Sequence, residues 1–153
     1  MLKLQLLDIP GIKLIEYFND QYSGILHTAP VLFIEFPDAL SFETLSKDMQ
    51  QAAFKARIHT VTKVIQKADK SINEDSVEGH FNICDAVFEK LQGFRAIDEN
   101  GQLIFNSVSM TVFEHHQEMR GFMVTTQDFE GIVYHRKSSV IAFSRPNVEI
   151  IKE

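Results

Sequence analysis

The fold class of this chain depends most on residues 76–93, SVEGHFNICDAVFEKLQG. Apolar side chains recur there at spacings of four, three, four and three residues, at Val77, Phe81, Cys84, Phe88 and Leu91, and Ile83 and Val87 widen the stripe. This period predicts an amphipathic helix over about 76–92. Asp75 or Ser76 is the expected N-cap, and Gly93 stands where a C-terminal cap belongs. The one apolar face of such a helix needs a sheet to cover it.

Strand patterns lie on both sides of this helix. Alternating or β-branched stretches predict strands over 12–18, 31–36 and 53–64, and a hairpin of 103–116 with 122–134, bulged near 129–131. Residues 1–8 predict a helical turn or two, and 39–51 a loop or ragged sheet edge. Short apolar stretches at 140–143 and 148–151 fit either an edge strand or a partner-binding arm. We therefore predict one α+β domain over 1–153, with a small mixed or antiparallel sheet covered on one face by helices.

Composition narrows the class of protein. With 153 residues, 44% of them apolar, the chain can bury one core. Its net charge is −6 and its basic residues are scattered, which argues against a groove that grips free nucleic acid. Cys84 is the single cysteine, so no internal disulfide is expected and a reducing compartment fits. We expect neither a membrane span nor a signal peptide, because the apolar runs are short.

Few residues suggest catalysis or metal binding. Phosphate-binding loops, dinucleotide fingerprints and nucleophile elbows do not occur in the sequence. A weak metal-hydrolase pattern consists of Glu114, His116 and Glu118. We favour the interpretation that these are polar residues at the end of a hairpin. Asp128 and Glu130 could share a strand face as paired carboxylates, and a solvated face is again favoured.

Two further residues have a structural and a chemical interpretation. Cys84 lies within the helical stripe, where a packed thiol is favoured over a reactive one. Glu35 stands among apolar residues, where a strand-end carboxylate that reaches water or pairs with Lys or Arg is favoured over a catalytic group. We therefore expect a protein that is not an enzyme, with no catalytic residue, no cofactor and no metal.

Two surfaces are candidates for contact with a partner or a second subunit. On the predicted strand 53–64, Lys55, Arg57 and His59 fall on the face opposite the apolar one. They could bind an anion or an acidic strip, or could simply be solvated. The second surface is the segment 38–51, whose Phe42, Leu45 and Met49 we expect to be exposed or half exposed.

Several local strings, in this order, resemble the tail terminator (tail completion) proteins of long-tailed bacteriophages, above all those of Bacteroides-type phages and prophages. The matching strings are IKLIE at 12–16 with NDQ at 19–21, APVLFIEF at 29–36, QQ at 50–51 before the strand 53–64, LQG at 91–93, and the closing hairpin. The resemblance spans about residues 12–134 and contains no catalytic signature, so it transfers no catalytic residue.

This resemblance implies a structural phage assembly protein. Such subunits form a ring, typically a hexamer, that caps the tail tube and connects the tail to the head, while DNA passes through without sequence-specific binding. The implied partners are further copies of the chain, the tail tube protein and head connector proteins. The implied location is the virion, and the host bacterial cytoplasm during assembly. The alternatives are a monomeric small-ligand or peptide-binding module and, more remotely, a metal-dependent hydrolase.

Overall fold

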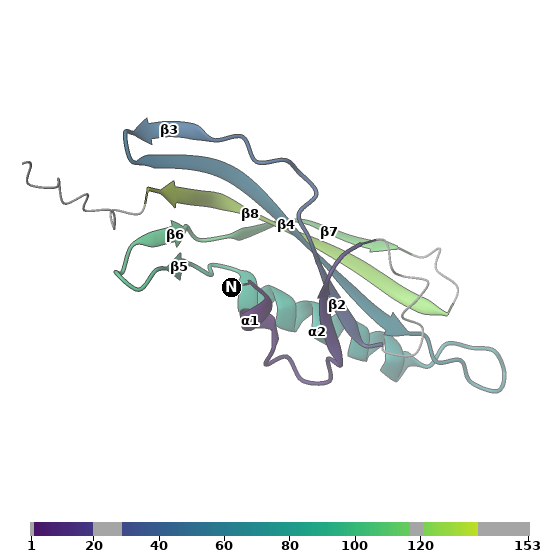
Figure 1. The fold of residues 1–153 in the computed structure, drawn as a ribbon. Helices are drawn as coiled ribbons and strands as arrows, with labels where there is room; N and C mark the ends of the chain where they lie inside the picture. The colour runs from purple at the N-terminus through teal and green to yellow at the C-terminus, as the bar shows by residue number, and fades with distance from the viewer. Residues whose placement is uncertain (1, 20–28, 117–120, 138–153) are drawn as a thin grey trace, which may run out of the picture.

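The computed structural model describes residues 2–19, 29–116 and 121–137. These residues form two helices and eight strands (Figure 1). Their order is α1 (Leu2–Leu6), β1 (Leu14–Tyr17), β2 (Val31–Glu35), β3 (Glu43–Ser46), β4 (Met49–Lys63), α2 (Glu74–Leu91), β5 (Ala96–Ile97), β6 (Leu103–Phe105), β7 (Ser109–His116) and β8 (Phe122–Arg136). The mixed α+β class is thereby confirmed. Among the described residues, no helix has the length and apolar character needed to cross a membrane.

All eight strands join in one curled sheet, whose central order is β1-β2-β4-β8-β6-β5 (Figure 1). Among the strand pairs of the described residues, only β1 and β2 run parallel. The antiparallel pair β4 and β8 forms the middle of the sheet, in unbroken register from Met49 opposite Arg136 to Lys63 opposite Phe122. On the edge of β4 that faces away from β8, both β2 and β3 pair with β4. On the edge of β8 that faces away from β4, both β6 and β7 pair with β8. The mixed sheet is thus larger than the sequence predicted.

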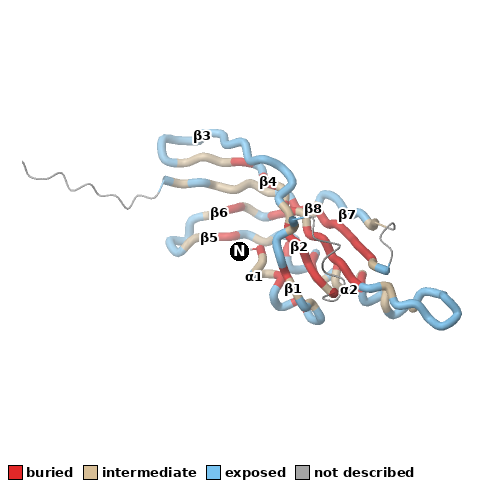
Figure 2. The backbone as a smooth tube through the Cα atoms, turned by 45° about the vertical axis from the view of Figure 1, so that its right-hand side comes forward, coloured by how far each residue is buried: buried red, intermediate tan, exposed pale blue. Residues whose placement is uncertain are grey.

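Alternation along β4 determines which side chains enter the core. Phe54, Ala56 and Ile58 point to one face and are buried. They form a cluster with Val87 and Leu91 of α2, to which α1, β2 and β8 also contribute. Figure 2 shows the buried residues concentrated where β2, β4 and β8 lie near α2, whereas the β3 end of the sheet is exposed. Helix α2 therefore packs against the inner parts of β4 and β8.

Helix α2 matches its predicted position closely but starts earlier. Its N-cap is Asn73, whose side-chain oxygen accepts a hydrogen bond from the Asp75 backbone N–H at 3.0 Å, so the predicted cap at Asp75 or Ser76 was wrong. Gly93 directly follows the C-cap with a φ of 78°, a left-handed conformation that glycine adopts readily. The buried stripe is rotated from the predicted one: Phe88 is exposed and His80 is buried.

Other predicted boundaries need correction. Segment 39–51 contains β3 and the start of β4, which form an edge hairpin. The predicted strand 103–116 is two strands, because residues between them leave β8: Val108 exchanges backbone hydrogen bonds with Gly93 and Phe94. The expected bulge at 129–131 is absent from β8, and the register shift lies in β7 instead, between Met110 and Val112. The helix near the N-terminus is confirmed, and segments 140–143 and 148–151 lie outside the described residues.

Candidate functional site: a charged ladder on the face opposite α2

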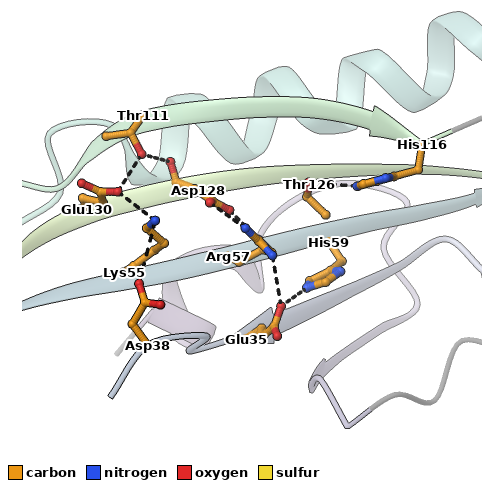
Figure 3. A network of polar contacts seen from close by, with 10 residues as sticks. All are labelled: Glu35, Asp38, Lys55, Arg57, His59, Thr111, His116, Thr126, Asp128 and Glu130. Atoms are coloured by element: carbon orange, nitrogen blue, oxygen red, sulfur yellow. Dashed lines mark hydrogen bonds and ion pairs between the residues drawn. The ribbon is translucent and has the colours of Figure 1, made fainter. Parts of the chain in front are cut away.

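Odd-numbered side chains of β4 project from the face of the sheet opposite α2. Lys55 and Arg57 are partly exposed there, and the residues opposite them on β8 are Glu130 and Asp128. Glu35, at the end of β2, lies opposite Arg57 on the other side. We call the set Glu35, Asp38, Lys55, Arg57, His59, Asp128 and Glu130 the charged ladder (Figure 3).

The centre of the charged ladder is an ion pair between Arg57 and Asp128. Arg57 Nε donates to Asp128 Oδ1 at 2.7 Å, and Arg57 Nη2 donates to Asp128 Oδ2 at 2.9 Å. Asp128 is only 2% exposed. These hydrogen bonds lower the pKa of the Asp128 carboxyl, although burial alone would raise it. Because the ion pair is bidentate and partly buried, it holds the guanidinium in one orientation.

The second cation of the charged ladder makes looser contacts. Lys55 Nζ lies 3.2 Å from Glu130 Oε1 and 3.8 Å from Asp38 Oδ2. The hydroxyl of Thr111 on β7 donates a hydrogen bond to Glu130 Oε1 at 3.2 Å, which connects the charged ladder to a third strand. Asp38 and Glu130 are exposed, so water screens these contacts and they contribute little to stability.

His59 is the inner end of the charged ladder. Its Nε2 lies 2.8 Å from Glu35 Oε2, and its ring stacks on Phe18 with centroids 4.4 Å apart. Burial lowers the pKa of His59, and the contact with Glu35 offsets this only in part. His59 is buried, so Lys55 and Arg57 are the parts of the predicted contact face that reach solvent. Glu35 pairs with Arg57 and His59, as expected for a strand-end carboxylate.

The second predicted contact surface lies on the β3–β4 hairpin, at the outer end of the sheet (Figure 1). Phe42 and Leu45 are 42% and 43% exposed, and Met49 is half buried. Six residues of extended strand separate Met49 from Lys55, which is about 20 Å. Phe42 contacts His135, which lies opposite Gln50 on the α2 face of the sheet, so the two predicted contact surfaces do not form one site.

Only part of the weak metal pattern at the end of β7 lies within the described residues. Glu114 and His116 share the face opposite α2, and His116 Nε2 lies 3.2 Å from the Thr126 hydroxyl. Glu118 lies outside the described residues. Within residues 2–19, 29–116 and 121–137, no three His, Cys, Asp or Glu side chains are placed to hold one ion. Asp128 and Glu130 do share a face, but each is paired with a cation.

A buried polar chain under α2 is a feature that the sequence analysis missed. His80 Nδ1 lies 2.8 Å from the Thr62 hydroxyl and His80 Nε2 lies 2.7 Å from the Thr125 hydroxyl, which also contacts His115 Nδ1 at 2.9 Å. Burial, with a smaller contribution from His115, lowers the pKa of His80 to about 4. The spacing of His80, Cys84, Val87 and Leu91 was the available signal. Cys84 is fully buried, and burial raises the pKa of its thiol.

An apolar groove lies on the α2 side of the sheet, between α1 and the β3 end. Its volume is about 270 Å³. The lining side chains come from α1, five strands and the segment after β2: Leu2, Tyr17, Ile34, Phe36, Leu40, Phe54, Phe105 and Val133. Phe36 and Leu40 are 53% and 46% exposed. The sequence analysis did not predict this groove.

Comparison with known proteins gives a match of fold but not of sequence. No protein-family model matches the chain, and no curated protein is significantly similar to it. The fold, however, has a solved counterpart. A chain from the virion of a native gene transfer agent (GTA) particle aligns with 87% of this chain and 91% of its own length, with a TM-score of 0.55 and 11% sequence identity. At that identity the likeness is one of fold.

Proposed function

We propose that this chain is a structural protein of a phage-like virion and, within that class, a tail terminator. It caps the tail tube and connects the tail to the head as a ring of subunits, for which a hexamer is the suspected size. The observation that carries the proposal is the fold shared with a chain of the gene transfer agent virion, which covers nearly the whole of both chains. The sequence resemblance to tail terminators supplies the more specific role.

The exposed edges of the sheet support a role in assembly. Among the described residues, β5 ends the central strand order on one side, and β3 and β7 lie beside that order, each with one outer edge. A free strand edge offers backbone N–H and C=O groups to a neighbouring chain. The exposed Phe42 and Leu45 add apolar contact area to the β3 edge. Subunit contacts in the ring, and contacts with the tube and connector proteins, would use these edges.

The charged ladder suits a surface that DNA passes. Its cations, Lys55 and Arg57, are already engaged by carboxylates of the same chain. Glu35, Asp38, Asp128 and Glu130 outnumber them, and His59 is held toward its neutral form by burial. A surface of this kind has little attraction for phosphate groups. We therefore propose that DNA passes this surface without sequence-specific binding, and the proposed role requires no cofactor and no reaction.

The test is assembly of tail tubes with and without this protein. A tail tube protein encoded in the same genome would be co-expressed with the chain, and tube lengths would be measured by negative-stain electron microscopy. We expect capped tubes of limited length with the protein present, and longer, uncapped tubes without it. The variant Phe42→Glu/Leu45→Glu should lose the cap while it remains folded. Unchanged tube lengths, together with no protein at the tube ends, would refute the proposal.

A second candidate is a monomeric module that binds a small ligand or a peptide. The apolar groove beside α1 favours it, because ligand sites are concave and mainly apolar. Light scattering during size-exclusion chromatography separates the two candidates only in part, since a tail terminator can remain monomeric until it meets the tube. Saturable binding of an apolar ligand, lost in Leu40→Asp but unaffected by Phe42→Glu/Leu45→Glu, would favour this module.

A further inference from the structure

A cationic cavity lies at the outer end of the sheet, where the β3–β4 hairpin meets the end of β8. Its volume is about 300 Å³, and most of its lining side chains are polar. Lys47 and Lys137 line it, and Asp48 is the one acidic residue among the lining residues. Within the described part of the chain, neither ammonium group is paired with a carboxylate, in contrast to that of Lys55 in the charged ladder. The cavity therefore offers two cations to a negatively charged partner.

An exposed aromatic ring borders this cavity. The centroid of the Phe42 ring lies 6.0 Å from that of His135, and His135 lines the cavity. Leu45, also exposed, lies between Phe42 and Lys47 on the same hairpin. A surface that combines apolar side chains with unpaired cations fits a partner that presents apolar side chains beside carboxylates.

The outer face of α2 has that complementary chemistry. Phe81 and Phe88 lie on one side of the helix at a spacing of seven residues, with Asp85 between them and Glu89 one turn beyond Asp85. Phe88, Asp85 and Glu89 are exposed, and Phe81 is half buried. Among the described residues, neither carboxylate forms an ion pair, whereas those of the charged ladder do. This face therefore presents aromatic rings flanked by unpaired carboxylates.

We propose that copies of this chain join head to tail, with the β3–β4 hairpin of one copy docked on the outer face of α2 of the next. The two lysines of the cavity meet the carboxylates of α2, and Phe42 packs on Phe88. Figures 1 and 2 both show the hairpin and α2 in different parts of the molecule, so the two surfaces pair between copies and not within one. Because the two surfaces differ, the contact is heterologous, and its repetition closes a ring or extends a filament. The choice of a closed ring rests on the proposed function.

Charge favours a second copy over nucleic acid as the occupant of the cavity. The chain has a net charge of −6, so copies that approach one another repel unless oppositely charged patches face each other. Two lysines beside Asp48 are enough to meet two carboxylates. A nucleic-acid surface needs a longer row of cations, and it gains nothing from the neighbouring Phe42 and Leu45 unless bases are unstacked.

Charge reversal tests this contact. Lys47→Glu/Lys137→Glu sets carboxylates against carboxylates, and Asp85→Lys/Glu89→Lys sets cations against cations. Because like charges across an interface repel, each double variant should weaken self-association at least about tenfold. The chain with all four changes should regain association, since opposite charges face each other again. Sedimentation velocity measures association, with tail tube protein added if the chain alone stays monomeric.

The matched control is Lys67→Glu/Lys70→Glu. It makes the same change in net charge as the cavity variant, at two exposed lysines in the connection between β4 and α2. We expect it to associate like the wild type. If the control weakened association as much as the cavity variant does, the effect would be one of net charge, and the proposed contact would be wrong.

Zero-length cross-linking of the wild type locates the contact directly. A carbodiimide would be added to a mixture of isotopically light and heavy protein, both free at high concentration and bound at the ends of tail tubes. We expect mass spectrometry to find links between light and heavy peptides that join a lysine of the cavity to Asp85 or Glu89. High salt should suppress these links, because exposed charges are screened.

Three outcomes would overturn the inference. The first is the absence of such light–heavy links in both samples, and the second is a fourfold variant that associates no better than the double variants. The third is DNA binding that Lys47→Glu/Lys137→Glu abolishes while association is unchanged, which would assign the cavity to nucleic acid. Double variants that cap tubes like the wild type would refute this contact alone. Wild-type protein that associates through this contact but leaves tubes uncapped would refute the proposed function alone.

Discussion

Arg57 of β4 and Asp128 of β8 face each other across the central strand pair and are joined by two hydrogen bonds of 2.7 and 2.9 Å. The carboxylate is buried, whereas the guanidinium is 34% exposed. The two partners therefore differ in what their removal would leave behind. Loss of the arginine leaves a buried negative charge, and loss of the carboxylate leaves a cation that can still reach water.

Arg57→Met should therefore destabilise the fold strongly. We expect a loss of about 2 kcal/mol or more in the free energy of unfolding, toward the low end for broken buried pairs because Arg57 is partly solvated. The double variant Arg57→Met/Asp128→Leu should recover most of the loss, since no buried charge is left unpaired: Glu35, the other partner of Arg57, is partly exposed and keeps its contact with His59. Lys55→Ala is the control, because its partners Asp38 and Glu130 are exposed. Urea unfolding measures all three, and a double variant no better than Arg57→Met would contradict this account.

His80 should make stability depend on pH. Because burial lowers its pKa to about 4, the folded protein binds this proton more weakly than the unfolded chain does. The contribution of His80 to the free energy of unfolding is therefore complete above the unfolded pKa of about 6.5. It declines as the pH falls toward 4, by at most about 1.4 kcal/mol per pH unit. Thr62, Thr125 and His115 face its ring and offer no negative charge to counter this.

Urea unfolding of the wild type and His80→Gln, at intervals between pH 7 and pH 4, checks this dependence. The variant should be less stable at pH 7 yet lose less stability on acidification. Since burial also lowers the pKa of His59, the difference between the two proteins is the informative quantity. Parallel pH profiles would show that His80 does not titrate in this window.

Two glycine-to-alanine substitutions should have opposite effects. A Cβ at Gly131 would lie 3.0 Å from atoms of both Phe54 and Val108, so Gly131→Ala overpacks the core and should cost about 1–3 kcal/mol. Gly79 lies within α2 and has open space where an added Cβ would lie, so Gly79→Ala should stabilise the protein by up to about 1 kcal/mol. Thermal unfolding compares them directly. A Gly131→Ala variant that melts at the wild-type temperature would contradict the packing described around Gly131, and a destabilised Gly79→Ala would contradict the open space at that site.

The β3–β4 hairpin should contribute to subunit contacts. We expect Phe42→Glu/Leu45→Glu to lower the oligomer fraction at the tube end without lowering the unfolding temperature, because both side chains are already largely exposed. Sedimentation velocity on ring-forming samples measures the first quantity and calorimetry the second. Ile72→Glu is the control, because Ile72 is 52% exposed but lies in the connection between β4 and α2, away from the strand edges. Equal assembly of the hairpin variant and the control would exclude the hairpin from the interface.

Periodicity predicted the central elements of the fold well. The boundaries predicted for the helix 76–92 and the strand 53–64 differ from those of α2 and β4 by at most four residues. The prediction succeeded because each element has a buried face that repeats along the chain. Strand β3 was not predicted, since all four of its residues are exposed and no burial pattern marks it. The break between β6 and β7 depends on hydrogen bonds from Val108 to the turn after α2, which are distant in sequence.

The candidate site was predicted in its parts but not as a whole. Alternation placed Lys55 and Arg57 on one face, and likewise Asp128 and Glu130, but the pairing of the two strands decides that these residues meet. His80 was missed because a polar ring in a helical stripe is recognised as buried only when its partners, Thr62 and Thr125, are known. The apolar groove combines five strands and a helix, which no local pattern could reveal.

Strands β4 and β8 pair without offset over fifteen residues each, and this limits how the chain can change in length. A single inserted or deleted residue near the middle of either strand would reverse the facing of every side chain beyond it. Arg57 would turn toward α2, and Ile58 toward water. Natural variants of this chain should therefore differ in length outside this strand pair, and an engineered tag or reporter would be tolerated in the connections and not within the two strands.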